Sequence, residues 1–328
     1  MRAFMQPSTR RFSSIRRANI GYGLRFLCIS VIISLIRPSP QRITFGPPQP
    51  VITNQPILGV HTRLTDEVEE WKIQRTLQMV REMGATHIVE FFPWAYYQAE
   101  DGSIAWEHPD LVIGHARANG LKVIARIGYT PDWARPPDTP LTYLDQDAYD
   151  EFAAFANANP DVQILAGALA PTVEPEGSPW AINDLTYLRG MYEVGAASFF
   201  DGLAVHAYGL TFPAEAEPAP EILNFRRVEL LREIMVEFGD ETTPIYITET
   251  GWNDHPRWTM AVRPGQRINY TLAAIDYAAE NWPYVKSIAL WAFRYPAPTR
   301  SYPDYFTLVT PEFMPKPIYD ALKEYTGN

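Results

Sequence analysis

Residues 244–252 read Pro-Ile-Tyr-Ile-Thr-Glu-Thr-Gly-Trp, and they are the most informative segment of this chain. The β-forming run 245–247 is typical of a strand buried on both faces of a parallel sheet. Glu249 ends that run, so its carboxylate is expected on the rim where parallel barrels carry their chemistry. Trp252 offers a flat apolar face beside it. The alternative is a Glu that only caps a strand, and the rest of the chain bears on that choice.

Strand-like and helical segments alternate along the chain. Strands are predicted at residues 57–63, 86–92, 121–127, 162–168, 200–208, 244–250 and 287–293. Helices are predicted at residues 66–83, 109–119, 146–157, 181–195, 221–238, 264–281 and 316–325. This alternation indicates one parallel α/β domain over residues 57–328. A TIM-type (β/α) barrel fits better than a doubly wound sheet, because no Gly-x-Gly-x-x-Gly or P-loop follows any strand.

The predicted strands number seven, whereas a barrel of this type has eight. About 34 residues separate the third strand from the fourth, and the loop 128–145 and one helix fill them. One βα unit is therefore predicted to be missing. Its loss leaves either a re-closed seven-stranded barrel or an open seam.

The N-terminal 42 residues differ in composition from the rest. They carry eight Arg and no acidic residue, with an apolar run at 26–36. This pattern predicts a signal peptide or short membrane anchor, and hence a secreted or otherwise extracytoplasmic protein. A disordered basic tail from a mis-set start codon is the alternative. The Pro-rich segment 43–56 is predicted to be a linker.

The remainder of the chain is acidic. Without the leader the formal charge falls from −10 to −18, since eight Arg leave and no acidic residue does. Such a charge argues against nucleic acid as a partner, and a membrane is expected only through the leader. The single Cys, Cys28, lies in the leader. No spacing of His or Cys predicts a metal or another cofactor.

Polar and aromatic residues follow the ends of six predicted strands. Because the carboxyl ends of parallel strands share one rim, these residues are expected to converge there. Carboxylate, Arg, His and Trp together suit a neutral polyhydroxy ligand, with aromatic faces for C–H surfaces and charged groups for hydroxyls. The predicted binding residues are His61, Arg63, Glu90, Trp94, Arg126, Trp133, His206, Tyr208, Trp252, Trp291 and Arg294.

Over residues 57–325 the chain resembles the clan A retaining glycoside hydrolases, the barrel superfamily with cellulase-like and β-xylosidase-like families. The matching motifs are Ile-Thr-Glu-Thr-Gly-Trp at 247–252, Val-His-Ala-Tyr at 205–208 and Leu-Trp-Ala-Phe at 290–293. The resemblance implies that Glu249 is the nucleophile. It also implies that His206 and Tyr208 line the adjoining subsite, and that Trp291 is the sugar platform.

One motif of the clan is absent. Its members carry the acid/base Glu in an Asn-Glu pair at the end of strand four, and no Asn-Glu pair occurs in this chain. Retaining hydrolysis uses two carboxyl groups about 5–5.5 Å apart, so the second group is unassigned. Glu174, in the Pro-rich loop 171–175, is a weak candidate. The plainer reading is that Glu174 faces solvent.

Three functional hypotheses follow. The first is a glycoside hydrolase of carbohydrate metabolism, acting on a β-linked oligo- or polysaccharide and impaired by the missing acid/base. The second is a pseudoenzyme, a non-catalytic barrel that binds carbohydrate. The third is a truncated, non-functional gene product with exposed strand edges.

Overall fold

The computed structural model describes residues 45–140, 162–175 and 177–328. The predicted leader and the predicted helix at 146–157 lie outside these ranges. Residues 47–56 form no regular element, but they pack against the body. Gln49 N donates to Ala118 O at 2.9 Å, and Asn54 N donates to Thr326 O at 3.2 Å.

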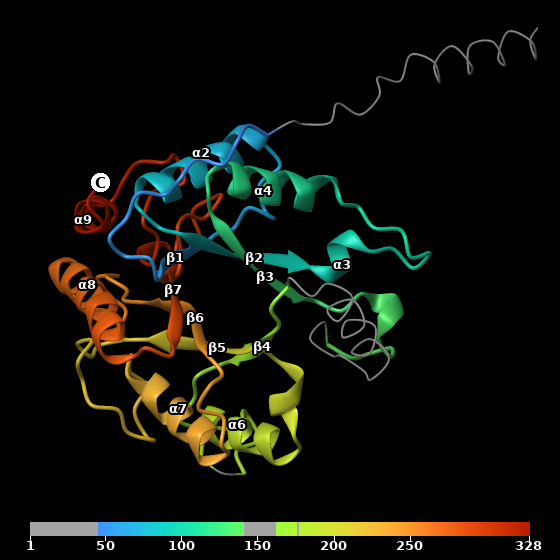
Figure 1. The fold of residues 1–328 in the computed structure, drawn as a ribbon, viewed down its shortest axis with the longest axis vertical. Coiled ribbons are helices and arrows are strands. Elements are labelled where there is room, and N and C mark those ends of the chain that lie inside the picture. Colours follow the sequence, from blue (N-terminus) through green and yellow to red (C-terminus); the bar gives the residue numbers. More distant parts are fainter. Residues whose placement is uncertain (1–44, 141–161, 176) are drawn as a thin grey trace, which may run out of the picture. The chain divides into compact units, whose positions relative to one another are not determined.

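The described body is built on one parallel sheet of seven strands (Figure 1). The strand order is β3-β2-β1-β7-β6-β5-β4. The strands are β1 (Leu58–His61), β2 (His87–Pro93), β3 (Lys122–Gly128), β4 (Leu165–Leu169), β5 (Gly202–Tyr208), β6 (Ile245–Gly251) and β7 (Val285–Leu290). This confirms the predicted TIM-type architecture with seven main strands.

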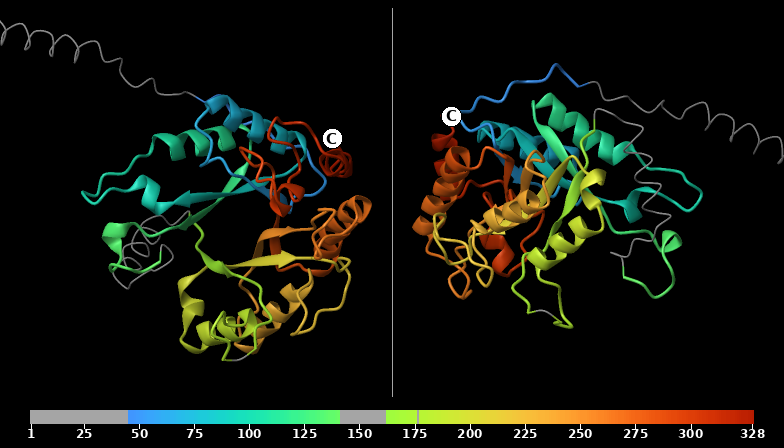
Figure 2. Two further views of the ribbon diagram at one scale, coloured as in Figure 1. Left: turned by 180° about the vertical axis from the view of Figure 1, so that it is seen from behind. Right: turned by 60° about the horizontal axis from the view of Figure 1, so that its bottom comes forward.

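The sheet curls without closing. In the ranges that the structure describes, no pairing joins β3 to β4, although every other pair of neighbours in the barrel order is hydrogen-bonded. Of the two predicted consequences of a missing βα unit, the open seam is the one present. Figure 2 shows the resulting half-barrel from two further sides.

Helices cover the outer side of the curled sheet (Figure 1). The α-helices are α2 (Glu70–Glu82), α3 (Trp94–Tyr97), α4 (Glu107–Ala118), α6 (Asp184–Glu193), α7 (Arg227–Glu237), α8 (Pro264–Asn281) and α9 (Pro317–Tyr325). Short 3-10 helices are η1 (Asp132–Ala134), η2 (Ala196–Phe199) and η3 (Tyr302–Tyr305). The sequence pattern did not predict α3 or the 3-10 turns, because pieces this short show no periodicity.

The spacing of apolar residues and a terminal glycine account for the formation and the end of helix α2. Ile73, Leu77 and Val80 recur at helical spacing and are fully or almost fully buried. Gly84, with φ +80°, ends the helical segment in the left-handed conformation. A Cβ at Gly84 would also lie 2.5 Å from the Thr326 hydroxyl, so only glycine fits there.

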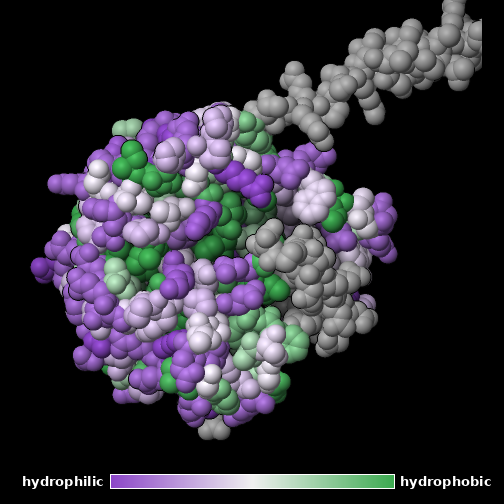
Figure 3. All heavy atoms as spheres, in the orientation of Figure 1, coloured by the Kyte–Doolittle hydropathy of each residue, from purple (hydrophilic) through white to green (hydrophobic). Residues whose placement is uncertain are grey.

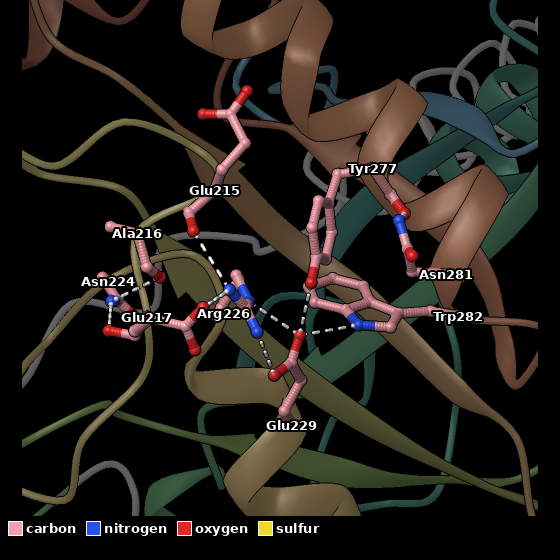
Figure 4. Close-up of polar contacts among 9 residues, drawn as sticks. All are labelled: Glu215, Ala216, Glu217, Asn224, Arg226, Glu229, Tyr277, Asn281 and Trp282. Atoms are coloured by element: carbon pink, nitrogen blue, oxygen red, sulfur yellow. Dashed lines mark hydrogen bonds and ion pairs between the residues drawn. The ribbon is translucent and has the colours of Figure 1, made fainter.

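A polar cluster ties α7 to α8 (Figure 4). Glu229 accepts hydrogen bonds from Arg226 Nε at 2.9 Å and Arg226 Nη2 at 3.0 Å. Its Oε1 also accepts from Tyr277 OH at 3.2 Å and from Trp282 Nε1 at 3.1 Å. One carboxylate thus fixes two helices and the chain that enters β7.

Two apolar clusters form the core between the sheet and the helices. One gathers residues of β1, β2, α2, α4 and α9. The other gathers residues of β5, β6, α7 and α8. On the face drawn in Figure 3 most of the surface is hydrophilic, and apolar side chains show toward its middle. No helix in the described ranges has the length and apolarity needed to cross a membrane.

Candidate active site

Glu249 lies near the C-terminal end of β6, and its side chain enters the interior of the half-barrel. The register sets its neighbours: His206 on β5 pairs with Glu249, and Tyr208 pairs with Gly251. In a parallel sheet, paired residues project from the same face. The spacing of His206 and Tyr208 therefore brings both side chains to Glu249.

Both carboxylate oxygens of Glu249 have partners. Tyr208 OH donates to Oε2 at 2.8 Å. Arg126 Nη1, from β3 across the open barrel, donates to Oε1 at 3.0 Å. His206 Nε2 lies 3.5 Å from the same oxygen. Strands β3, β5 and β6 thus meet at one carboxylate.

His61, at the end of β1, completes the cluster. Its Nδ1 lies 2.9 Å from Thr62 O. A carbonyl only accepts, so Nδ1 carries the hydrogen and Nε2 keeps a free lone pair. Nε2 lies 3.9 Å from Glu249 Oε1 and finds no hydrogen-bond partner among the described residues. This atom is a buried acceptor beside Glu249.

Burial sets the charge state of the two imidazoles. Burial, together with the positive charge of Arg126, lowers the pKa of His61 to about 3 and the pKa of His206 to about 4. Both rings are therefore neutral near pH 7. Arg126 is then the cation paired with Glu249.

Opposing effects act on Glu249. Burial raises its pKa, and this effect outweighs the hydrogen bond from Tyr208 and the charge of Arg126, which favour the carboxylate. The result is a shielded carboxylate that ionises at higher pH than a free Glu.

Two further predicted residues line the β7–β1 side. Trp291 directly follows β7, and its ring centroid lies 4.4 Å from that of His61. Arg63 follows β1, where it binds Asp66 at 2.9 Å and lies 5.6 Å from the Tyr295 ring. Trp291 is half-buried and keeps part of its face open.

Aromatic rings continue from Arg126 along the β2–β3 side. The guanidinium of Arg126 lies 5.4 Å from the Phe91 ring, which meets Tyr129 edge-on at 4.9 Å. Further along, Trp94 and Trp133 pack edge-on at 5.7 Å. Trp133 remains 38% exposed, so its face is available beside the rim.

Three predicted binding residues lie elsewhere. Trp252 is 1% exposed, packs against Phe225, and donates from Nε1 to Phe212 O at 2.8 Å. It is a core residue and forms no wall of the site. The two-residue period of a strand explains this, because position 252 faces away from the side that position 249 occupies.

Arg294 and Glu90 are also structural. Arg294 is 4% exposed and pairs with buried Glu67 in the outer layer. Glu90 is fully buried, and it accepts hydrogen bonds from Thr62 Oγ1 at 2.6 Å and Leu64 N at 2.9 Å. The β2–β3 register puts Phe91 on the face of Arg126, which leaves Glu90 on the opposite face.

Glu174 does not join the cluster. It lies in the loop after β4, where Ser178 Oγ donates to its Oε2 at 2.7 Å. Among the described residues, no side chain that contacts Glu249 also forms a hydrogen bond or ion pair with Glu174. The second carboxyl group therefore remains unassigned. These parts of the chain also hold no group of three or more His, Cys, Asp or Glu side chains placed to bind a metal.

Phe91 and Tyr295 were missed as site residues. Phe91 stands one residue after Glu90, and the sequence does not show which of the two faces inward. Tyr295 stands one residue after Arg294, and burial raises its pKa. Phe91 lies within β2 and Tyr295 lies past the end of β7, so each stands near a strand end, but neither residue carries an obvious catalytic group.

The fold is that of barrel glycoside hydrolases. A family 39 glycoside hydrolase from Bacteroides cellulosilyticus WH2 is similar, with a TM-score of 0.61 and 17% identity, and the match covers 85% of this chain and 65% of that chain. A GH5_18 protein from Streptomyces cattleya in complex with GlcNAc matches with a TM-score of 0.57 and 17% identity, covering 83% of this chain and 80% of that one. XacCel5A in complex with cellopentaose matches with a TM-score of 0.52 and 14% identity, covering 82% and 98%.

These likenesses establish the fold that the sequence motifs predicted. The chain spans 65% of the family 39 protein's length. No protein-family model matches the chain, and no curated protein matches it either.

Proposed function

We propose that this protein binds a β-linked oligo- or polysaccharide and reacts with it as a retaining glycoside hydrolase that lacks its acid/base. Glu249 is the nucleophile. Trp291 provides the stacking face for the sugar, and His61 and His206 contact its hydroxyl groups.

The environment of Glu249 is the main observation that supports this proposal. A carboxylate that is buried, held by Arg126 and Tyr208, and flanked by two neutral imidazoles is positioned and shielded from bulk water. Positioned donors keep such a group oriented for attack at low reorganisation cost. A Glu that merely capped a strand would have no need of partners from three other strands.

The chemical step follows from these groups. A carboxylate oxygen of Glu249 bonds to the anomeric carbon while the bond from that carbon to the leaving oxygen breaks. An aryl oxygen leaves as a stabilised phenolate and needs no proton. A sugar oxygen needs a proton, and loss of a general acid lowers the rate by about 10²–10⁴.

The open seam accounts for the missing acid. In the clan that the motifs resemble, the acid/base residue lies at the end of strand four, between the strands that correspond to β3 and β4. That is where the described sheet is unpaired. We therefore propose slow turnover of natural glycans and residual reactivity toward activated aryl glycosides.

Carbohydrate binding without catalysis is the second candidate. The open seam favours it, because the described sheet is unpaired at the position where the clan carries its acid/base residue. The basic, apolar N-terminus supports export in either case, and we propose an extracytoplasmic location.

Pre-steady-state kinetics with a panel of dinitrophenyl β-glycosides test the proposal. We expect a burst of phenolate followed by slow turnover, because no base activates water for the second step. Azide should accelerate that step, since an anion attacks without a base. Glu249→Ala should abolish the burst, and Glu174→Ala should leave it unchanged. A burst that survives Glu249→Ala would contradict the proposal, and rapid hydrolysis of polysaccharide would show that another carboxylate is the acid.

A further inference from the structure

We infer that a second carbohydrate-binding site lies on the outer side of the β1–β7 rim, in a groove formed by α2 and the loops after β7. We call it the Trp71 groove. It has a volume of about 730 Å³. Trp71, Lys72 and Arg75 line it from α2, and Pro296, Pro298 and Phe313 line it from the loops. Ligand clefts span about 300–1,000 Å³, so its size suits a ligand of a few sugar units.

Trp71 is the central feature of the groove. It is 54% exposed, although Trp is among the most costly side chains to leave in water. Its Nε1 donates to Glu69 Oε1 at 3.1 Å, and Lys72 pairs with the same carboxylate and lies 5.7 Å from the indole ring. The part of the indole that remains exposed can serve as a stacking platform.

Phe313 extends the aromatic surface beside Trp71. Its ring centroid lies 5.8 Å from that of Trp71, within contact distance, and the buried guanidinium of Arg294 supports it from 4.2 Å. Phe313 has φ +63°, an uncommon conformation for a residue with a side chain. Its turn is closed by Phe313 N donating to Thr310 O at 2.9 Å. Backbone strain of this kind clusters at ligand-binding sites.

The chemistry of the lining favours a glycan. Aromatic and proline rings offer flat apolar faces for the C–H surfaces of sugar rings. Lys72 and Arg75 supply donors, and Glu312, which also lines the groove, supplies an acceptor for hydroxyls. Aromatic grooves also bind extended proline-rich peptides, so such a peptide is the alternative ligand.

The position of the groove favours the same ligand. Pro296 follows Trp291 by five residues at the end of β7, and α2 follows the end of β1. Both walls therefore lie at the C-terminal end of the sheet, as Glu249 does. This inference rests on the proposed function, since we assign to the groove a more distant part of the glycan that reacts at Glu249.

Affinity electrophoresis of the full chain in gels containing hydroxyethyl cellulose, xylan or glucomannan tests the groove. All variants are made in a Trp291→Ala background. This substitution weakens binding at Glu249, so the remaining binding reports on the groove. We expect retardation by at least one of these polymers, and Trp71→Ala in this background should weaken it about tenfold. Trp71→Phe should retain most of the binding, because it keeps an aromatic face. Trp180→Ala, at a Trp that is 86% exposed elsewhere, is the matched control.

Retardation that is unchanged by Trp71→Ala, or equally reduced by Trp180→Ala, would overturn the inference. Binding of a proline-rich peptide in place of the three polymers would overturn the glycan assignment. Labelling of Glu249 by a mechanism-based inhibitor is a separate readout. Trp71-dependent retardation without labelling would support the groove and contradict the proposed chemistry at Glu249. Labelling of Glu249 without retardation would support that chemistry and contradict the groove.

Discussion

Glu249 is the residue whose ionisation the site controls most closely. The hydrogen bond from Tyr208 favours the carboxylate, whereas burial raises the pKa of Glu249. Tyr208→Phe removes that bond, so the pKa should rise further. A nucleophile acts as the carboxylate, and its rate falls as pH falls through this pKa. The acidic limb of the pH–rate profile for an aryl glycoside should therefore shift upward by about one to two pH units, since a charged hydrogen bond contributes about 1.5–3 kcal/mol.

Tyr187→Phe is the control for this substitution, because Tyr187 is an exposed residue of α6. It should leave the profile unchanged. A downward shift in Tyr208→Phe would mean that Tyr208 does not stabilise the ionised form of Glu249.

Gly59 illustrates a residue whose identity depends on a neighbouring strand. A Cβ at this position would lie 2.1 Å from His87 Nε2, and that ring is held by Ser287 Oγ at 2.6 Å and Thr86 Oγ1 at 3.0 Å. Gly59→Ala should lower the free energy of unfolding by about 1–3 kcal/mol through overpacking. Gly167→Ala is the matched control, since nothing lies within 4 Å of its added Cβ. Equal stability of the two variants in urea denaturation would refute this account.

Some residues of the candidate site were predictable from the sequence, and others were not. The position of Glu249 after a buried strand, and the spacing of His206 and Tyr208, predicted the three side chains that now lie together. Trp252, Glu90 and Arg294 also stand near strand ends, but each faces the helical layer. Trp252 stands three residues after Glu249, and the strand period already places it on the other face. For Glu90 the face becomes clear only from the register with β3, so the assignment of these three residues to the site was wrong.

At the level of elements, the docking of α7 on α8 depends on Glu229. Its carboxylate accepts from Arg226, Tyr277 and Trp282. Glu229→Gln keeps the size but removes the charge that holds the Arg226 guanidinium. We expect a loss of about 1–3 kcal/mol in the free energy of unfolding, as for charged hydrogen bonds that are mostly buried. Glu233→Gln, at an exposed carboxylate of the same helix, should change stability by less than about 0.5 kcal/mol. An equal loss in both variants, measured by chemical denaturation, would exclude this role.

Periodicity predicted the described long elements, while their ends were less well defined. The helix predicted from residue 66 begins at Glu70. The difference arises because Glu90 binds the backbone of Leu64 and Thr65 and holds the preceding segment as a loop. Such a long-range contact leaves no mark in the local sequence.

For the whole molecule, the number of strands was predictable but their closure was not. The spacing between residues 127 and 162 leaves no room for another βα unit, and the described residues form a sheet of seven strands. Whether seven strands re-close depends on the tilt and stagger that the curled sheet adopts, which periodicity does not encode. The described sheet is open between β3 and β4, at the position where the clan carries its acid/base.

We propose that Glu249 remains a nucleophile in a barrel without its acid/base partner. Intact mass spectrometry after incubation with 2-fluoro dinitrophenyl β-glycosides tests this role, because the fluorine traps the glycosyl–enzyme intermediate. We predict a single added 2-fluoroglycosyl group, located by peptide mapping on Glu249 and absent from Glu249→Ala. No adduct with any sugar of the panel, in a sample shown to be folded by circular dichroism, would contradict the claim.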